Sequence, residues 1–502
     1  MAFLFILFVL TTIIAISLTL FLMGKRILIR RKLSDEHRIH KNCVILAFFH
    51  PYCNSGGGGE RVLWTGISAI LQRWPNVFIF IYTNDKECLT APVAVFRRVN
   101  SVFGIDILKL KALSRIQFVP LITEPLLRPS QYPHFTLAGQ ALGSVIAALE
   151  AVFRRPPDIF LDTTGFSFTM PIFAWLAGSA CGAYVHFPTI SSDMEIRVRE
   201  QGLSGRVSEG TAYNNSEEIR RNKFLTAAKL AYYYIFKKAY CWSGSKPNCE
   251  LAAVNSSWTK NHISRMWGGS PVLLYPPCPV EHLIDKKTSA EGRKPWIISV
   301  GQFRPEKNHR LQILAFARFI KTLSPIRTPP GCPYRLLLVG GSRDGADAVR
   351  VEKLRELVEQ LGLSDLVDFH INASWDTLGK LFKHSSINLH SMVDEHFGIG
   401  IVEGMAAGLV TIAHRSGGPL TDIIGPAQGS LPTAAGEALP TKSTVGFLAS
   451  TETEYARLFE YVLVQMTPAQ RQMIGEAAAA RANTMFSEAA FIRGWMGFLK
   501  CL

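Results

Sequence analysis

The sequence predicts an α/β protein with two Rossmann-like domains that face each other across a cleft, preceded by an N-terminal transmembrane helix. Two observations predict the domains. From residue 43 onward, short apolar runs alternate with helical patterns, and this alternation restarts after the Pro-rich stretch 275–282. Such alternation is typical of βαβ units around a parallel sheet. The third observation predicts the membrane helix: residues 2–23 contain no charged side chain.

Residues 2–23 are the first element. As a helix they would be about 33 Å long, enough to cross a bilayer core. Cations follow at residues 25, 26, 30, 31 and 32, and the positive-inside rule then places residues 40–502 in the cytosol. A cleaved signal peptide is the alternative, but the run is long for one and no A-x-A-like cleavage site follows. We therefore expect residues 1–32 to form a single-pass anchor with a basic juxtamembrane segment.

The first domain is expected over residues 40–285. Two of its segments have alternative interpretations. Residues 166–187 fit a helix followed by a buried strand, or a second membrane span. Residues 224–240 mix tyrosines and lysines with apolar side chains, which fits a packed helix or a helix lying in the membrane surface. The expected strands are Val44–Phe49, Val77–Tyr82, Ile116–Pro120, Ile159–Asp162 and Gly182–His186, with helices around 60–73, 138–152, 168–177 and 217–240.

The second domain is expected over residues 295–480, after a polar linker near 283–294. A helix within 481–502 is expected to cross back to the first domain. Ligands of open parallel sheets bind at the carboxyl ends of the strands, so the site should lie in the cleft between the domains. The expected strands here are Trp296–Val300, Arg335–Gly340, Leu366–His370, Ser386–His390 and Leu409–Ala413.

Charge and cysteine content narrow the class of protein. The formal net charge is +15, which suits an anionic membrane, a phosphorylated small molecule or a nucleic acid. Zinc-finger spacing and RNA-binding aromatic signatures are both missing from the sequence, so we expect no nucleic acid partner. The nine cysteines are scattered, without a C-x-x-C pair. This pattern favours a reducing compartment over a disulfide framework.

The stretch "HPYCNSGGGGERVLW" (50–64) places four glycines between the first strand and a helix start. Glycine costs roughly 0.5–1 kcal/mol per residue relative to alanine inside regular structure. A flexible turn is one explanation. Close approach of a ligand to bare backbone amides at a helix N-terminus is the other. The run lacks the Lys-Ser/Thr pair of a Walker loop and the acidic residue that confirms a dinucleotide fingerprint.

Two further stretches carry charged side chains at expected strand ends. "SVGQFRPEKNH" (299–309) puts Arg304 and Lys307 beside a helix start, which suits a diphosphate, although an exposed basic loop is the alternative. "DEHFGIGIVEGMAAG" (394–408) places Glu395 in a loop before a helix and Glu403 inside the helix. Carboxylates accept hydrogen bonds from vicinal sugar hydroxyls. A solvated acidic pair is the alternative, but the apolar neighbours of Glu403 mean that its charge needs a partner.

Together these stretches resemble glycosyltransferase family 4, whose members are retaining enzymes of the GT-B fold that use nucleotide sugars. E-x7-E before Gly-Met-Ala-Ala-Gly, with an upstream G-x-F-x-x-x-K-N, carries the family resemblance over about residues 40–500. "HPYCNSGGGGERVLW" and "AYVHFPTISSDM" narrow it to the GDP-mannose-dependent α-1,2-mannosyltransferases of the dolichol pathway. These add the fourth and fifth mannoses to the dolichyl-diphosphate-linked oligosaccharide at the cytosolic face of the endoplasmic reticulum.

The resemblance implies roles for individual residues. His186 would face the donor sugar, the two cations would neutralise the departing GDP, Glu395 would touch mannose and Glu403 ribose. Gln302 stands where many relatives have arginine, which leaves open how Arg304 and Lys307 divide their work. The implied catalytic residues are His186, Arg304, Lys307 and Glu395, and the implied donor-binding residues are Gly57, Gly58, Gly59, Arg304, Lys307, Phe397, Gly398, Ile399 and Glu403.

No D-x-D occurs in the sequence, so we expect no metal site and no cofactor, and the leaving-group charge should be met by cations and helix dipoles. The expected partners are GDP-mannose, the dolichyl-diphosphate-linked oligosaccharide and the membrane, with a complex with other mannosyltransferases as an option. Two other functions stay open at this point: a membrane-bound family member that uses a UDP-sugar, and a non-catalytic scaffold of the pathway. An intact Lys307 and both glutamates speak against the scaffold.

Overall fold

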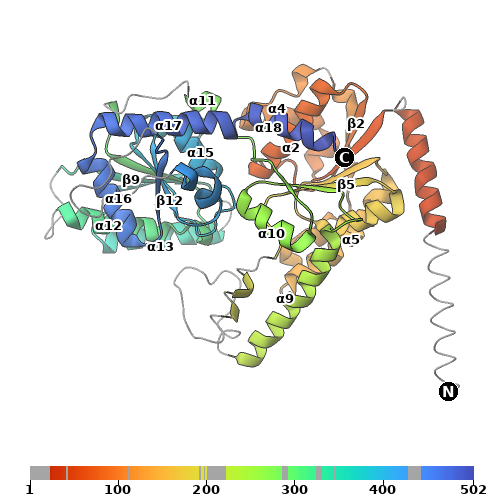
Figure 1. Cartoon of the computed structure of the whole chain (residues 1–502), viewed down its shortest axis with the longest axis horizontal. Coiled ribbons are helices and arrows are strands. Elements are labelled where there is room, and N and C mark those ends of the chain that lie inside the picture. Colours follow the sequence, from red (N-terminus) through yellow and green to blue (C-terminus); the bar gives the residue numbers. More distant parts are fainter. Residues whose placement is uncertain are drawn as a thin grey trace.

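The structure is a computed structural model of the whole chain (Figure 1). The residues it describes are 23–40, 43–110, 112–190, 194–196, 198–199, 222–284, 292–323, 331–342, 345–427 and 443–502.

The first sheet is parallel and has the strand order β3-β2-β1-β4-β5-β6-β7. Five of its strands are those expected from the apolar runs, although β5 begins and ends earlier than predicted. The last two strands, β6 and β7, were not expected. The strands are β1 (Val44–Phe49), β2 (Val77–Thr83), β3 (Ile116–Pro120), β4 (Ile159–Asp162), β5 (Ala180–Val185), β6 (Leu251–Val254) and β7 (Val272–Leu273).

The second sheet is also parallel, with the order β10-β9-β8-β11-β12-β13. Its strand β13 was not expected, and β10, β11 and β12 each differ from their predicted bounds by one residue at both ends. The strands are β8 (Trp296–Val300), β9 (Arg335–Gly340), β10 (Val367–Ile371), β11 (Ile387–Leu389), β12 (Val410–His414) and β13 (Gly446–Ala449). The expectation of two Rossmann-like parallel sheets is confirmed.

Helices cover both faces of each sheet (Figure 1). The helices of the first half are α2 (Gly58–Arg73), α3 (Lys86–Thr90), α4 (Pro92–Phe103), α5 (Thr136–Arg154), α6 (Met170–Ile172), α9 (Lys223–Gly244), α10 (Ser257–Trp267) and α11 (Glu281–Ile284). Those of the second half are α12 (His309–Leu323), α13 (Gly345–Gln360), α14 (Trp375–His384), α15 (Ile399–Ala406), α16 (Glu452–Glu460), α17 (Pro468–Phe486) and α18 (Glu488–Leu499).

The C-terminal helices tie the two halves together (Figure 1). Helix α17 packs on α15 beside the second sheet, whereas α18 packs on α2 beside the first. Trp495 of α18 is fully buried, and its indole lies where a Cβ on Gly66 of α2 would be only 2.9 Å away. The absence of a side chain at Gly66 therefore lets the last helix seat closely on the first domain.

The predicted segment 166–187 is a run of short helical turns followed by β5. The turns are Ser167–Thr169, Met170–Ile172 and Phe173–Ala177. Strand β5 pairs with β4 and β6 inside the sheet. The helix-and-strand interpretation is therefore confirmed over the second membrane span.

The expected anchor 2–23 lies outside the described residues except for Met23, and the residues described after it are helical over 23–39. That helix runs along the side of the first domain (Figure 1). Its Ile29 is buried, and Lys32 donates a hydrogen bond to the Phe153 carbonyl at 2.7 Å. Among the described residues, one helix, α5, has the length and apolar composition to cross a membrane.

Candidate active site

The carboxyl ends of three neighbouring strands of the first sheet form one side of the candidate site. His50 follows β1, Thr163 follows β4 and His186 follows β5. Because β1, β4 and β5 are adjacent and parallel, these residues emerge at the same edge. His50 and Thr163 are both 1% exposed, while His186 is half-buried. A buried polar cluster therefore lies where ligands of such sheets bind.

Hydrogen bonds connect this cluster to the glycine run. His50 Nδ1 lies 2.8 Å from Thr163 Oγ1, and His50 Nε2 lies 3.3 Å from Glu60 Oε1. The other oxygen of Glu60 accepts a hydrogen bond from Gly57 N–H at 2.6 Å. The Thr163 carbonyl is 3.1 Å from His186 Nε2. Helix α2 thus begins within the glycine run, and the carboxylate of Glu60 in its first turn holds the amide of Gly57.

The glycine run also meets the second domain. A Cβ on Gly58 would lie 2.8 Å from Cδ1 of Ile399, the first residue of α15, and a Cβ on Gly59 would lie 3.6 Å from His186 Nε2. Any larger residue at Gly58 would push against the start of α15. The predicted loop residues Gly58, Gly59, Ile399 and His186 are therefore brought together across the domain boundary.

Lys307 and Glu395 form the centre of the second domain's side of the site. Lys307 Nζ is 2.6 Å from Glu395 Oε2, and His390 Nε2 is 3.2 Å from the same oxygen. Lys307 lies just before α12, with its aliphatic chain over Gly301. Burial opposes ionisation of Glu395, but Lys307 and the hydrogen bond to His390 outweigh it and hold the pKa well below its usual range. Glu395 is therefore a carboxylate at neutral pH.

Three histidines of the site, His186, His390 and His396, are neutral at pH 7. Burial lowers the pKa of His186 to about 4, with His50 adding to the effect. Burial also lowers the pKa of His390 and of His396, although Glu395 acts in the opposite direction on both. The amine of Lys307 therefore lies against Glu395 in a site where these three histidines carry no charge.

Glu403 lies in α15 and is 9% exposed. Burial raises its pKa to about 6, and the positive charge of Arg61 partly offsets the effect. Arg61 comes from α2 of the first domain, is itself buried, and donates to the Phe103 carbonyl at 3.3 Å. The positive charge that the buried position of Glu403 requires therefore comes from Arg61, on the other side of the domain boundary.

Three predicted site residues, Arg304, Phe397 and Gly398, make no side-chain contact with Lys307 or Glu395 that the structure records. Arg304 approaches Glu306 at 3.7 Å, and its Nε atom is buried without a hydrogen-bond partner among the described residues. Phe397 is 3% exposed and its ring packs against Tyr275 and Phe486, so only its backbone can face a ligand. Gly398 has φ of 103°, a conformation that glycine adopts readily, and it precedes α15.

A second set of contacts holds the two domains in register next to the site. The ring of His396 stacks with Phe187 at 5.5 Å and lies 5.1 Å from Trp258. Asp422 accepts hydrogen bonds from Ser257 N–H at 3.0 Å and from the Tyr275 hydroxyl at 2.9 Å. The chain segments next to the site are therefore fixed by direct contacts between the domains.

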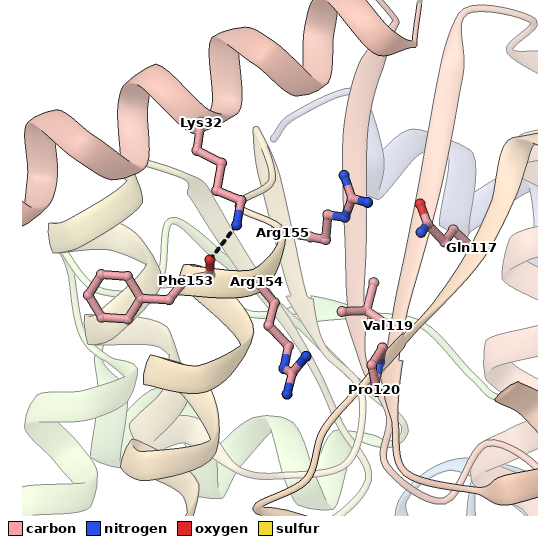
Figure 2. Close-up of a pocket in the computed structure, with 7 residues that line it drawn as sticks. All are labelled: Lys32, Gln117, Val119, Pro120, Phe153, Arg154 and Arg155. Atoms are coloured by element: carbon pink, nitrogen blue, oxygen red, sulfur yellow. Dashed lines mark hydrogen bonds between the residues drawn. The ribbon is translucent and has the colours of Figure 1, made fainter.

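A separate pocket of about 360 Å³ opens between the helix over 23–39, the end of α5 and β3 (Figure 2). Its three cationic side chains point in different directions, and each has a partner: Lys32 the Phe153 carbonyl, Arg154 Glu150, and Arg155 Glu36. It contains none of the predicted site residues. Within the described ranges, no group of three or more His, Cys, Asp or Glu side chains is placed to hold a metal ion.

The sequence did not single out Glu60, Arg61, His390 or Thr163 as site residues. His50 and Glu60 stood in the quoted glycine stretch, and the position of His50 directly after a strand was the available signal. His390 ended a predicted strand in the same way. Arg61 gave no such signal, because its relation to Glu403 exists only once the two domains meet.

Both halves of the chain match known protein families. Residues 43–267 match the family described as "ALG11 mannosyltransferase N-terminus", and residues 281–439 match "Glycosyl transferases group 1". The Homo sapiens protein named "GDP-Man:Man(3)GlcNAc(2)-PP-Dol alpha-1,2-mannosyltransferase" is 39% identical over 95% of this chain and 91% of that protein. Proteins of the same name from Dictyostelium discoideum (39%, over 91% and 85%) and Caenorhabditis elegans (34%, over 90% and 89%) are also similar.

Solved structures share the fold at low sequence identity. The Anabaena protein Alr3699/HepE in complex with UDP-glucose superimposes with a TM-score of 0.56 at 14% identity, over 91% of this chain and 100% of that one. Sucrose-phosphate synthase from Thermosynechococcus elongatus gives 0.57 at 16% identity, over 91% and 98%. These likenesses confirm the expected GT-B arrangement of two domains.

Proposed function

Because the chain belongs to the family of GDP-Man:Man(3)GlcNAc(2)-PP-Dol α-1,2-mannosyltransferases, we propose that the residues at its domain boundary form the catalytic site of that reaction. The protein is an enzyme that transfers mannose from GDP-mannose to a dolichyl-diphosphate-linked oligosaccharide in α-1,2 linkage. The acceptor in the relatives' name carries three mannoses. We propose that this enzyme adds the fourth and the fifth, with retention of the α configuration.

The single observation that carries the site assignment is the pair of Lys307 Nζ and Glu395 Oε2, 2.6 Å apart at the carboxyl edge of the second sheet. When the bond between mannose and GDP breaks, negative charge builds on the diphosphate. A fixed ammonium stabilises that charge without reorganisation at the moment of reaction. When the donor binds, and before the bond breaks, Lys307 would turn from Glu395 to the diphosphate, and Arg304 would add charge from the same loop.

The carboxylates would then hold the two sugars of the donor. Glu395, released from Lys307, would accept hydrogen bonds from the mannose hydroxyls, and Glu403 from the ribose hydroxyls. The backbone amides of Gly398 and Ile399 open α15, where a helix N-terminus favours phosphate oxygens. His186 would accept a hydrogen bond from the transferred sugar, and Gly57–Gly59 would lie where the donor diphosphate and the acceptor meet. No step in this scheme needs a metal ion or a cofactor.

The same proposal places the enzyme at the cytosolic face of the endoplasmic reticulum membrane, anchored by residues 2–23. The basic residues that follow the anchor support this orientation. Helix α9 supports a second membrane contact, because it presents large apolar side chains to solvent: Phe224, Leu225, Tyr234, Ile235 and Trp242. Tyr233, Phe236 and Tyr240 of the same helix are buried, so α9 both packs on the domain and exposes an apolar face.

The test is transfer by the purified full-length protein in detergent, with GDP-mannose and a short-chain lipid-linked trimannosyl acceptor. The parent should transfer mannose from GDP-mannose and should transfer no sugar from a UDP-sugar. Lys307→Met keeps the aliphatic stem and removes the charge, so it should lower the rate by at least a hundredfold. Lys294→Met is the matched control and should keep the parental rate, because Lys294 lies just before β8 and places its ammonium over the ring of Trp296, outside the site.

A further inference from the structure

Glu60 occupies an unusual place in the first domain. It lies in the first turn of α2, and its side chain is 13% exposed. One carboxylate oxygen accepts from Gly57 N–H at 2.6 Å and the other faces His50 Nε2 at 3.3 Å. Burial raises its pKa, but the hydrogen bonds from His50 and Gly57 outweigh burial and leave the pKa below its usual value. Glu60 is therefore ionised at neutral pH and has both oxygens engaged by the protein.

The protonation of the neighbouring groups follows from their partners. A carboxylate only accepts hydrogen bonds, so His50 Nε2 must carry the proton that it shares with Glu60. In a neutral ring His50 Nδ1 then accepts from the Thr163 hydroxyl, 2.8 Å away. Neither nitrogen of His50 remains for a substrate. His50 is thus a structural link between Glu60 and Thr163, and no general base.

The backbone carbonyl of Thr163 connects this hydrogen-bond network to His186. Its carbonyl oxygen can only accept, so His186 Nε2, at 3.1 Å, carries the proton of the ring. Burial lowers the pKa of His186 to about 4, so the ring is neutral at pH 7. The remaining nitrogen, Nδ1, then has a lone pair and accepts hydrogen bonds. The contact with Thr163 selects the tautomer that can receive a sugar hydroxyl.

We propose that Glu60 is the positioning residue of this half of the site: through Gly57 it sets the path of the glycine run, and through His50 and Thr163 it holds in place the Thr163 carbonyl that orients His186. This inference rests on the function proposed above, because it assumes that His186 and the glycine run contact the substrates. Glu60 itself touches neither donor nor acceptor. Its effect is on the geometry of the groups that do.

The expected consequence is a loss of rate without a loss of nucleotide binding. In Glu60→Gln the side-chain amide keeps one oxygen, which can accept a hydrogen bond from either Gly57 or His50. Its NH2 group then faces the other of these two residues, where a donor meets a donor. Either the glycine run or the chain to His186 is then released. Since the contacts proposed for Lys307, Glu403 and the first amides of α15 with the nucleotide all lie in the second domain, kcat should fall at least tenfold while the affinity for GDP stays within about twofold.

Glu150 offers a matched control. It also lies in the first domain and uses its carboxylate to hold a loop, accepting from Ile122 N–H at 2.9 Å and Thr123 N–H at 2.8 Å, but it is not in the site. Glu150→Gln should lower thermal stability about as much as Glu60→Gln and keep the parental kcat. Equal kcat for both variants would show that Glu60 is a structural residue only, and would overturn the proposal.

The link to His186 is tested by a double-mutant cycle. In a His186→Asn background, Glu60→Gln should lower kcat by less than threefold, and an undiminished tenfold loss would refute the link. If Glu60→Gln does not fold, Thr163→Val replaces the hydroxyl by a methyl of the same size and should lower kcat through the same chain. An inactive parent would refute the proposed function, whereas an active parent with unaffected variants refutes only the role of Glu60.

Discussion

Replacement of Glu403 by glutamine should make the enzyme more stable and a poorer binder of its donor. Burial raises the pKa of Glu403 from its usual 4.5 to about 6, although Arg61 partly offsets the effect. An acid whose pKa is raised by folding is costly in its ionised form. The cost is absent below about pH 4.5, grows between pH 4.5 and 6, and is constant above.

The size of this cost follows from the two pKa values. A difference of about 1.5 corresponds to about 2 kcal/mol at neutral pH. Glutamine has nearly the same shape and no charge, so Glu403→Gln should raise the free energy of unfolding at pH 7.5 by up to about 2 kcal/mol. At pH 4, where the parent carboxyl is protonated, the gain should vanish. Denaturant unfolding in detergent at the two pH values measures both quantities.

Donor binding should change in the opposite direction. If only ionised Glu403 holds the ribose, a pKa of about 6 means that GDP-mannose binding weakens about tenfold between pH 7.5 and pH 5. The neighbouring histidines His186, His390 and His396 have pKa values lowered by burial, so they titrate less in this range. GDP-mannose itself has no diphosphate group that titrates there.

Isothermal calorimetry without acceptor measures this dependence. Glu403→Gln should bind GDP-mannose about tenfold more weakly at pH 7.5, since it loses a charged acceptor, and its affinity should hardly change with pH. Two results would contradict these expectations for Glu403. Glu403→Gln could be less stable than the parent at pH 7.5, or it could keep the parental pH dependence of binding. The first would contradict the buried charge, and the second the contact with ribose.

Glu395, the packing of α18, the membrane contact of α9 and the membrane topology can each be tested separately. Glu395→Ala should lower kcat with GDP affinity nearly unchanged, because the mannose ring changes charge and shape in the transition state; equal losses in both would contradict its role. Trp495→Ala should cost about 3–5 kcal/mol in denaturant unfolding, since the buried indole fills the space between α18 and α2. A chain without residues 1–32 should still sediment with anionic liposomes, less so at high salt, and failure at low salt would count against α9 as a membrane contact. Asn372 is exposed and begins an N-x-S/T glycosylation pattern. If residues 40–502 are cytosolic, full-length protein from cells should show no mass shift on glycosidase treatment. A mass shift that disappears in Asn372→Gln would show that these residues face the lumen.

Much of the fold could be predicted because its strands are buried apolar runs with clear ends. The runs that became β1, β3, β4, β8 and β9 have the predicted bounds. The strands that were missed are short: β6 has the sequence Leu-Ala-Ala-Val, β7 has two residues and β13 has four. At that length neither period nor apolar content identifies a strand, and pairing with a neighbour decides the outcome.

The site was predictable in part for a similar reason. Lys307 and Glu395 stand in stretches whose spacing and position at strand ends reveal them, and the structure brings them together. The charge of Arg61 near Glu403 and the link from Glu60 to His186 arise between elements that are distant in the chain. Such relations depend on how the domains and strands are placed, which one sequence does not contain.

The chemical structure of the product is the strongest test of the proposed reaction. Purified enzyme is incubated with isotopically labelled GDP-mannose and the lipid-linked trimannosyl acceptor, and the released oligosaccharide is analysed by mass and by digestion with an α-1,2-specific mannosidase. The account predicts a product enlarged by two mannoses, both removed by the mannosidase. A product of unchanged mass, or one whose added sugars resist the mannosidase, would contradict it.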